Sequence, residues 1–296
     1  MMSARFLTVV LERAFNMRDG FGREIDYMRI SVIDSCNLNC YYCNPCDNNE
    51  HCHALNILSV KEVLCIVRAA TRLGIKHFRL TGGEPLLHPQ IDEMVLQIKK
   101  IPGVSSVSLT TNAVLLAQHA KWLKEAGIDS INVSLDTIDA SEYERITKKP
   151  LLEEVKHGIN AAIECGIRVK INVVLTPQTD VVALTRYVAK KGTDIRFIEM
   201  MPVGEGHTNG VEPYKKVIGT LSKLYGEPCR INTEKTKEIN SGNDKRKIPD
   251  NGPAEYYIFP ELGIRVGLIQ AIHGKFCDTC NRIRVTADGR LMPCLG

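Results

Sequence analysis

The chain has 296 residues, of which 44% are hydrophobic and 24% are charged, and its formal net charge is +4. This length suits one large domain or two smaller ones, and no apolar run approaches the roughly 18 residues of a membrane span. The basic residues are dispersed, which favours a solvated surface, with a local site for an anionic small molecule as the alternative. No nucleic-acid-binding motif accompanies them, so we expect neither nucleic acid nor a membrane as a partner.

The chain contains eleven cysteines, an odd number in a chain too long for a disulfide-stapled mini-protein. Six of them fall into two short-spaced groups, which indicates metal binding and a reducing compartment. The apolar stretch from Phe6 to Leu11 spans only six residues and is followed by charged residues, so it is not typical of a signal peptide. We therefore expect a cytoplasmic protein.

Strands and helices alternate through the first two thirds of the chain. Helix-period segments end in Gly74, Gly127, Gly166 and Gly192, because glycine accepts the left-handed conformation that ends a helix. A short connection then leads to a strand each time. The predicted strands, in chain order, are Tyr27–Ile33, His77–Thr81, Ser105–Thr111, Ser130–Leu135, Val169–Leu175 and Ile195–Glu199.

The helix predicted over Ser59–Leu73 shows a clear start. Ser59 and Glu62 have the spacing of a capping box, and apolar residues at helical spacing line one face. Strands that alternate with helices predict a parallel sheet with right-handed crossovers. Six such units are fewer than the eight of a closed barrel. The expected fold class is therefore α/β, a partial (βα)6 TIM-like barrel with its active face at the carboxyl ends of the strands.

After Met201 the pattern changes. The sequence predicts one helix over Tyr214–Tyr225, a polar Lys-rich loop over Thr233–Lys247, and two short strands over Glu255–Phe259 and Gly263–Leu268. We expect residues 19–202 to form the partial barrel. Residues 203–296 are expected to form a C-terminal extension that packs on the barrel or plugs it.

Cys36, Cys40 and Cys43 form a Cx3CxxC motif directly after the first predicted strand. A [4Fe–4S] cluster held by protein alone takes four cysteines, so three thiolates leave one iron open for another ligand. Two alternatives remain. Zinc needs four ligands, and Cys46, His51, Cys52 and His53 are nearby candidates. A ferredoxin-like register that uses Cys46 would place its fourth cysteine at Glu50.

The motif resembles that of the radical S-adenosylmethionine (SAM) superfamily, in which three cysteines hold a [4Fe–4S] cluster and SAM binds its fourth iron. Residues 81–85, Thr-Gly-Gly-Glu-Pro, follow the second strand, where that superfamily has a Gly-Gly-Glu-Pro motif. Glycines there let backbone groups approach a ligand closely. The resemblance implies SAM contacts at Tyr42, Gly83, Ser134 and Met201; taken singly, Ser134 and Met201 also suit a capping or core role.

Cys277, Cys280 and Cys294 form a second triplet, with the spacing Cx2Cx13C. The segment from Phe276 to Leu295, together with Asn132–Asp136 and Ile195–Glu199, resembles the GTP 3′,8-cyclases, the molybdenum cofactor biosynthesis protein A family. The resemblance covers the chain from about residue 19 to residue 295. It implies a second [4Fe–4S] cluster, held by this triplet.

The resemblance implies an enzyme of the first step of molybdenum cofactor biosynthesis. SAM cleaved at the first cluster yields a 5′-deoxyadenosyl radical, which removes the C3′ hydrogen of GTP. C3′ then bonds to guanine C8, and the product is 3′,8-cyclo-7,8-dihydro-GTP. The second cluster is expected to bind guanine through its open iron. An external electron donor and product hand-off to a cyclic pyranopterin monophosphate synthase are implied as well, whereas a homodimer is left open.

The resemblance also implies which residues contact GTP. Because GTP carries about four negative charges, cations should face its cavity. A lone buried cation on a strand is costly unless it is paired, which favours a bound anion over unrelated surface salt bridges. Strand alternation places Arg29, Ser31 and Ile33 on one face, and it places Arg282 and Arg284 together likewise. The implied contacts are Arg29, Arg79, Thr110, Lys170, Arg282 and Arg284.

The sequence departs from the family pattern at several positions. The chain stops at Gly296, two residues past Cys294, whereas the family continues to a Gly-Gly tail; this bears on full activity and not on cluster binding. Asn44 stands where Met is common, and Cys46, Cys52 and Cys65 have no assigned role. Two other functions stay open: a radical SAM enzyme with an auxiliary cluster and another substrate, and a non-catalytic iron–sulfur protein that binds nucleotide.

Overall fold

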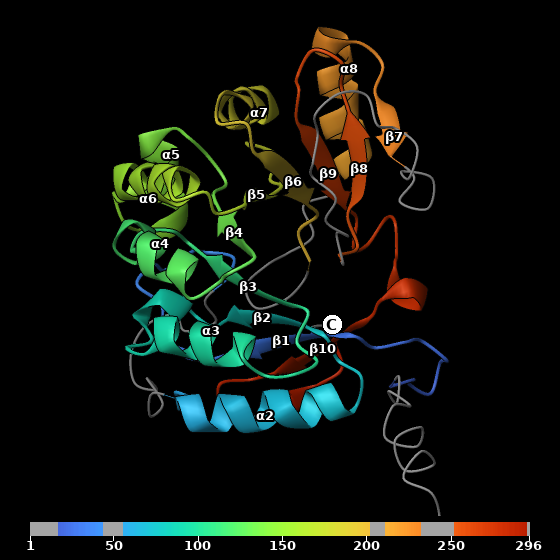
Figure 1. Ribbon diagram of the computed structural model, residues 1–296. Helices are drawn as coiled ribbons and strands as arrows, with labels where there is room; N and C mark the ends of the chain where they lie inside the picture. Colours follow the sequence, from blue (N-terminus) through green and yellow to red (C-terminus); the bar gives the residue numbers. More distant parts are fainter. Residues whose placement is uncertain (1–16, 44–55, 202–210, 232–251, 295–296) are drawn as a thin grey trace, which may run out of the picture.

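The computed structural model describes residues 17–43, 56–201, 211–231 and 252–294. Within these residues one sheet curves into an open arc, with the strand order β11-β10-β1-β2-β3-β4-β5-β6-β9-β8-β7 (Figure 1). Neighbouring strands from β10 through β9 are parallel, and the outermost pairs are antiparallel. The strands are β1 (Tyr27–Ser31), β2 (His77–Thr81), β3 (Ser106–Thr111), β4 (Ser130–Ser134), β5 (Val169–Val174), β6 (Asp194–Ile198), β7 (Cys229–Ile231), β8 (Glu255–Ile258), β9 (Arg265–Ile269), β10 (Arg282–Val285) and β11 (Leu291–Met292).

Helices α2 to α7 lie along the outer side of this arc (Figure 1). Their apolar faces form the core with the sheet: Val63 and Val67 of α2 are fully buried, as are Ile30 of β1 and Leu80 of β2. No described helix is long and apolar enough to cross a membrane. The helices are α2 (Val60–Arg72), α3 (Ile91–Lys99), α4 (Leu116–Glu125), α5 (Ala140–Thr147), α6 (Leu152–Glu164), α7 (Val181–Lys190) and α8 (Gly219–Tyr225), with a π-helical turn at Tyr214–Ile218 and 3₁₀ turns at Pro85–Leu87 and Cys277–Thr279.

The inner face of the sheet is polar, which is unusual for parallel strands. Such strands are commonly covered on both faces and are then apolar throughout. In β1, Met28 and Ile30 are buried in the core. The residues that alternate with them, Arg29 and Ser31, line a cavity on the opposite face. The same alternation continues across β2 to β5, whose inner side chains are Arg79, Thr81, Ser108, Thr110, Asn132, Ser134, Lys170 and Asn172.

The predicted fold class, an α/β partial barrel, is confirmed. Ser59 caps α2 through a capping box, in which the Ser59 N–H donates to Glu62 Oε2 at 2.8 Å and the Glu62 N–H donates to Ser59 Oγ at 3.3 Å. The four glycines predicted to end helices all have positive φ angles, between 62° and 91°. The first strand is shorter than predicted: β1 ends at Ser31, and Ile33 is buried in the core instead of sharing the face of Arg29.

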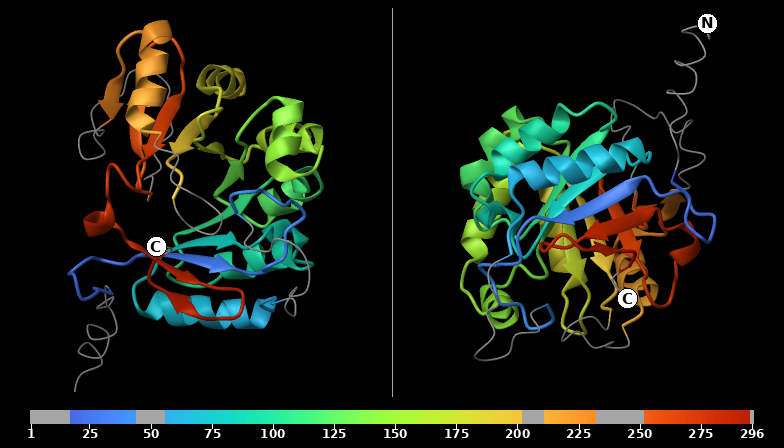
Figure 2. Two further views of the ribbon diagram at one scale, coloured as in Figure 1. Left: turned by 180° about the vertical axis from the view of Figure 1, so that it is seen from behind. Right: turned by 90° about the horizontal axis from the view of Figure 1, so that it is seen from below.

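The described residues of the C-terminal part extend the sheet, and Gly252, Pro253 and Arg282 of this part line a cavity on its inner face. β10 pairs in parallel with β1, and β9 pairs in parallel with β6, so eight parallel strands of the described chain stand side by side. Figure 2 shows β10, in red, next to β1, in blue. The boundary between residues 202 and 203 stays a prediction, since the sheet contains strands from both sides of it. The predicted loop Thr233–Lys247 lies outside the described residues.

Candidate functional site

The first cysteine triplet lies in the loop after β1, at the carboxyl ends of the parallel strands. The free thiols of Cys36, Cys40 and Cys43 all line one cavity of about 490 Å³, within the range of small-molecule sites. A turn brings two of them together, since the Cys43 N–H donates to the Cys40 carbonyl at 2.9 Å. Burial, followed by the charge of Asp136, raises the pKa of Cys40 to about 12. Soft metals bind the thiolate, so loading this site releases protons.

These residues fit an iron–sulfur cluster with an open iron, because three thiols and no fourth cysteine of the described chain face this cavity. In the described ranges, no three His, Cys, Asp or Glu side chains converge closely enough for a single metal ion. The ligands named for the zinc alternative, Cys46, His51, Cys52 and His53, lie outside those ranges, as does Asn44. Cys65 is an exposed, free cysteine on α2.

The Gly-Gly-Glu segment after β2 packs directly on the cysteine loop. A Cβ atom on Gly82 would lie 2.4 Å from the Ile33 carbonyl oxygen, and one on Gly83 would lie 2.1 Å from the Ser35 oxygen. The Gly83 N–H donates to Ile33 and the Glu84 N–H donates to Ser35, both at 2.8 Å. Both glycines also line the cysteine cavity. They are therefore needed for backbone packing, a reason that the motif alone does not reveal.

Glu84 is a structural residue of this region. Its carboxylate is 1% exposed and accepts hydrogen bonds from the Leu86 N–H at 3.0 Å, the Thr111 hydroxyl at 2.7 Å and the Asn112 N–H at 2.7 Å. Asn112 in turn donates to Asn37 Oδ1 at 2.7 Å. This chain of contacts holds the Cys36 side of the loop against β2 and β3.

Three of the four predicted SAM contacts line the cysteine cavity. Tyr42, Gly83 and Ser134 are brought together there, whereas Met201 is half-buried and lines neither of the two cavities described here. The Tyr42 hydroxyl donates to Asp136, which sequence analysis did not single out. Burial raises the pKa of Asp136 to about 6, and it also raises that of Tyr42.

Five of the six predicted GTP contacts line a second cavity of about 290 Å³, and Arg284 lines the first. Strand register explains the concentration of charge: Arg29 on β1 stands opposite Arg79 on β2 and opposite Arg284 on β10. Burial and then the charge of Arg284 lower the pKa of Arg29 to about 9. Burial and then Arg282 lower the pKa of Arg284 to about 10. The cations thus destabilise one another.

The arginine row has no carboxylate partner in the described part of the chain. None of Arg29, Arg79, Arg282 and Arg284 forms an ion pair with a carboxylate there. The buried Nε of Arg29 has no hydrogen-bond partner among the same residues. Because an unpaired buried cation is costly, this arrangement favours an anionic ligand. The second cavity shares Arg29, Thr110, Ser134 and Val174 with the first, so the two cavities adjoin.

Further polar residues of the second cavity were missed by sequence analysis. Strands β4, β5 and β6 place Asn132, Asn172 and Arg196 in its wall, and Arg168, just before β5, also lines it. Arg196 is 4% exposed and donates to Asn172 Oδ1 at 2.9 Å. Polar residues at every second position of β3, β4 and β5 were the signal, since a strand in a filled core would carry apolar residues there.

The second cysteine triplet lies at the β10 edge of the sheet. Cys277 and Cys280 are joined by a turn just before β10, and Cys294 follows β11. Met292 pairs with Arg284 in the β10–β11 hairpin, and continuing this register sets Cys294 opposite Arg282, two residues after Cys280. Burial raises the pKa of Cys280, but the hydrogen bond from Arg282 at 3.4 Å and its charge reverse the effect, so the net pKa is lowered.

Comparisons with known proteins agree with this architecture. The family model described as the radical SAM superfamily matches residues 30–184, and the one described as Molybdenum Cofactor Synthesis C matches residues 193–296. The chain is similar to Streptococcus suis SuiB, solved bound to S-adenosylmethionine, with a TM-score of 0.64 and 15% identity over 92% of this chain and 60% of SuiB. It is also similar to anSMEcpe with bound AdoMet, with a TM-score of 0.56 and 21% identity over 67% of this chain and 60% of that one. At these identities, both likenesses show the fold alone.

Curated relatives are more similar in sequence. The GTP 3′,8-cyclases of Clostridium perfringens strain SM101 and Pelotomaculum thermopropionicum are each 38% identical to 94% of this chain, which spans 83% and 84% of their lengths. The GTP 3′,8-cyclase of Listeria monocytogenes serovar 1/2a is also 38% identical over 94% of this chain and 82% of its own length. The chain therefore belongs to the GTP 3′,8-cyclase family within the radical SAM superfamily.

Proposed function

We propose that this protein converts GTP to 3′,8-cyclo-7,8-dihydro-GTP, the first step of molybdenum cofactor biosynthesis. One observation carries the proposal: the cavity of the first cysteine triplet adjoins a cavity lined by a row of arginines, and the two share Arg29, Thr110, Ser134 and Val174. In this arrangement, a radical formed from SAM at the cysteine site would lie next to a polyanion bound by the arginines. Family membership supports GTP as that polyanion.

In this proposal Cys36, Cys40 and Cys43 hold a [4Fe–4S] cluster, and SAM lies beside Tyr42, Gly83, Ser134 and Met201. When bound, the cluster and SAM would supply a carbon radical that takes a hydrogen atom from ribose C3′. C3′ would then bond to guanine C8, and one electron and one proton from outside the substrate would complete the 7,8-dihydro product. The polypeptide holds the ribose near the radical source and excludes water. Arg29, Arg79, Lys170 and Arg284 neutralise the triphosphate, and Thr110 lies where the two cavities meet.

The second triplet, Cys277, Cys280 and Cys294, is proposed to hold the other [4Fe–4S] cluster. Three cysteines again leave an iron open, and Arg282 lines the GTP-side cavity while it donates to Cys280. This position suits an iron that binds guanine at one end of the substrate. An external electron donor reduces the first cluster. The product passes to a cyclic pyranopterin monophosphate synthase. Nine free cysteines among the described residues support a reducing compartment, the cytoplasm.

An anaerobic assay tests the function. The full chain is reconstituted with iron and sulfide, reduced with dithionite and given SAM and GTP, and 5′-deoxyadenosine and the cyclised nucleotide are measured. Formation of both products, dependent on GTP, is expected. SAM cleavage that is indifferent to GTP would remove the substrate assignment, and would favour a radical SAM enzyme with another substrate. Nucleotide binding without any SAM cleavage would favour the non-catalytic iron–sulfur protein.

Iron content tests the two sites separately. We expect about eight irons per chain when both clusters form. Cys36→Ala and Cys277→Ala should each lose about four of them, and Cys65→Ala, at a free exposed cysteine, should lose none. About four irons in the wild type, lost in Cys36→Ala and retained in Cys277→Ala, would contradict the second cluster.

A further inference from the structure

Tyr42 lies between two of the cluster cysteines, and three contacts tie its loop to one neighbouring segment. The Asn39 N–H donates to the Thr147 carbonyl at 3.0 Å, and the Tyr41 N–H donates to the Ile146 carbonyl at 3.1 Å. The third contact is the hydrogen bond from the Tyr42 hydroxyl to Asp136. All three acceptors belong to the stretch from the end of β4 through α5.

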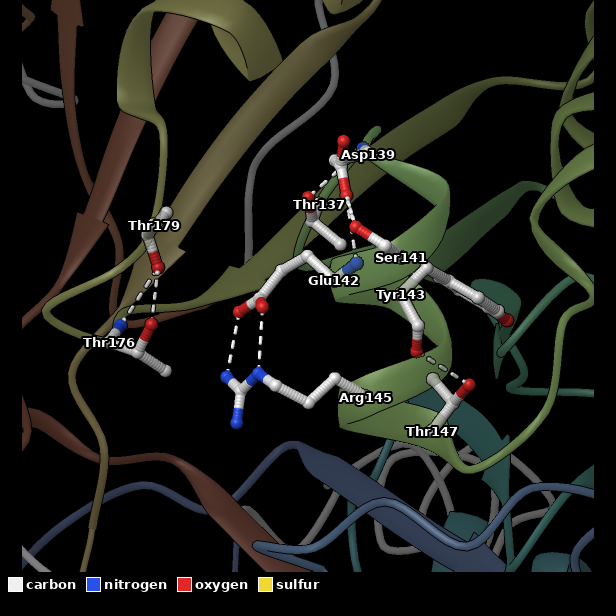
Figure 3. Close-up of polar contacts among 9 residues, drawn as sticks. All are labelled: Thr137, Asp139, Ser141, Glu142, Tyr143, Arg145, Thr147, Thr176 and Thr179. Atoms are coloured by element: carbon white, nitrogen blue, oxygen red, sulfur yellow. Dashed lines mark hydrogen bonds and ion pairs between the residues drawn. The ribbon is translucent and has the colours of Figure 1, made fainter.

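Helix α5 provides a firm base for these contacts. Asp139 caps its start by accepting from the Glu142 N–H at 2.8 Å, and Arg145 pairs with Glu142 at 2.7 Å on its exposed side (Figure 3). At its other end the Thr147 hydroxyl donates to the Tyr143 carbonyl at 2.8 Å. The last carbonyls of a helix have no partner within it, and here two of them accept from the cysteine loop.

Asp136 connects this loop to the barrel itself. One carboxylate oxygen accepts from the Tyr42 hydroxyl and the other accepts from the Val174 N–H at 2.7 Å, at the end of β5. Asp136 lines the arginine-rich cavity, and Tyr42 lines the cysteine cavity. Tyr42 and Asp136 therefore stand at the boundary between the two cavities. Each carboxylate oxygen of Asp136 accepts one hydrogen bond.

We propose that Asp136 is a positioning residue for SAM: by holding Tyr42 against the end of β5, it sets the shape of the cysteine cavity where SAM binds. Tyr42 adjoins Cys43 and forms part of the wall of that cavity, so a ring released from Asp136 would alter the pocket without removing a thiol. This inference rests on the proposed function only in taking SAM as the ligand. The arginine row that is proposed to hold GTP lies on β1, β2 and β10, away from the Tyr42 side chain, whereas Asp136 itself also lines the arginine-rich cavity.

Two nearly isosteric variants test the proposal. Tyr42→Phe removes only the hydroxyl. Asp136→Asn replaces one carboxylate oxygen by an amide nitrogen, which can only donate. If its remaining oxygen accepts from the Val174 N–H, the charge-assisted bond from the Tyr42 hydroxyl is lost and only a neutral contact of reversed direction can replace it. With the reconstituted protein kept oxidised, so that SAM is bound and not cleaved, each variant should weaken SAM binding about tenfold in equilibrium dialysis with iron content unchanged. Tyr42→Phe, whose side chain lines only the cysteine cavity, should also leave GTP affinity unchanged. The double variant should be no weaker than the single ones, because both changes break one interaction.

Asp139→Ala is the matched control, because it loosens the start of α5 and leaves the Tyr42–Asp136 bond in place. It should keep wild-type SAM affinity and the wild-type change in the electron paramagnetic resonance signal of the reduced cluster when SAM is added. In Tyr42→Phe and Asp136→Asn that change should be smaller. Unchanged SAM affinity in the two test variants, additive losses in the double variant, or an equal loss in Asp139→Ala would each overturn the proposal.

The binding measurements separate this inference from the proposed function. A wild-type protein that binds SAM and forms no cyclised nucleotide, with variants that weaken SAM binding as expected, would overturn the cyclase function and leave the role of Asp136 standing. Full cyclase activity, with wild-type SAM affinity in both variants, would support the cyclase function and overturn the role of Asp136. A wild-type protein that does not bind SAM would overturn both.

Discussion

Arg29 occupies an unfavourable position in the ligand-free protein, and this follows from its neighbours. Arg79 and Arg284 stand opposite it in register, and its buried Nε has no hydrogen-bond partner in the described part of the chain. The lowered pKa of Arg29, about 9, reflects burial first and the neighbouring arginines second. An unpaired buried charge costs free energy, so a bound anion would stabilise the Arg29 guanidinium.

Arg29→Met should therefore separate binding from stability. Loss of a charge-assisted contact costs about 1.5–3 kcal/mol, so the KM for GTP should rise roughly ten- to hundred-fold. The ligand-free protein should melt at the same or a higher temperature, because an unpaired buried cation has been removed. Arg68→Met, at an exposed position inside α2 and away from its last turn, is the matched control and should change neither quantity. A fall in ligand-free stability with an unchanged KM would contradict this account.

His88 gives a pH dependence with a definite sign. It is 2% exposed; its Nε2–H donates to the Leu58 carbonyl at 2.9 Å, and its Nδ1 accepts from the Gln90 N–H at 3.1 Å. Burial lowers its pKa from the ordinary 6.5. Below pH 6.5 the unfolded chain then binds a proton that the folded chain does not, so this group makes stability fall as the pH falls.

Urea unfolding of the cluster-free protein between pH 5 and pH 7.5 measures that effect. The free energy of unfolding of the wild type should rise more steeply with pH than that of His88→Gln, even though the variant is less stable overall. If the unfolding free energies of the two proteins rise equally with pH, His88 has the same pKa in the folded and unfolded chains, which would contradict this account.

At the scale of elements, the cysteine loop depends on close approach by the segment after β2. A methyl group on Gly83 would meet the Ser35 carbonyl oxygen at 2.1 Å, and that backbone lies one residue before Cys36. Gly83→Ala should therefore displace the loop and reduce the iron content from about eight to about four per chain.

Gly219→Ala is the control for that substitution. Gly219 begins α8 with helical φ and ψ angles, and a Cβ atom there would meet nothing within 4 Å. Alanine is the better helix former by about 1 kcal/mol, so this variant should keep its iron and gain stability. Full iron content in Gly83→Ala would show that the loop tolerates the displacement.

At the scale of the whole molecule, one sheet joins the two ends of the chain. Because β10 pairs with β1 and β9 with β6, the strands before residue 202 and after residue 252 share backbone ladders. We expect them to unfold in one cooperative transition. Hydrogen exchange followed by mass spectrometry in rising urea should give β4 and β9 the same midpoint. Earlier opening of β9, with β4 still protected, would indicate two independent domains, as the predicted boundary allowed.

Local signals in the sequence predicted five helices (α2, α4, α6, α7 and α8), the six central strands and both cysteine motifs. Helix period, capping at Ser59, glycine at helix ends and short cysteine spacing each involve residues a few positions apart. The strands β10 and β11 could not be predicted in the same way. β10 pairs with β1 across about 255 positions of the chain, and β11 pairs only with β10, so the assembled sheet determines where both strands lie.

The sequence by itself determined the fold class, the spacing of the six clustered cysteines and the identity of the arginines. Only the tertiary structure decided how these meet. Strand register sets Arg29 between Arg79 and Arg284. The hydrogen bond from the Tyr42 hydroxyl to Asp136 joins residues 94 positions apart, one in the wall of each cavity. The physical reason is that hydrogen-bond ladders and packing convert separations along the chain into contacts, and spacing in the sequence carries no record of them.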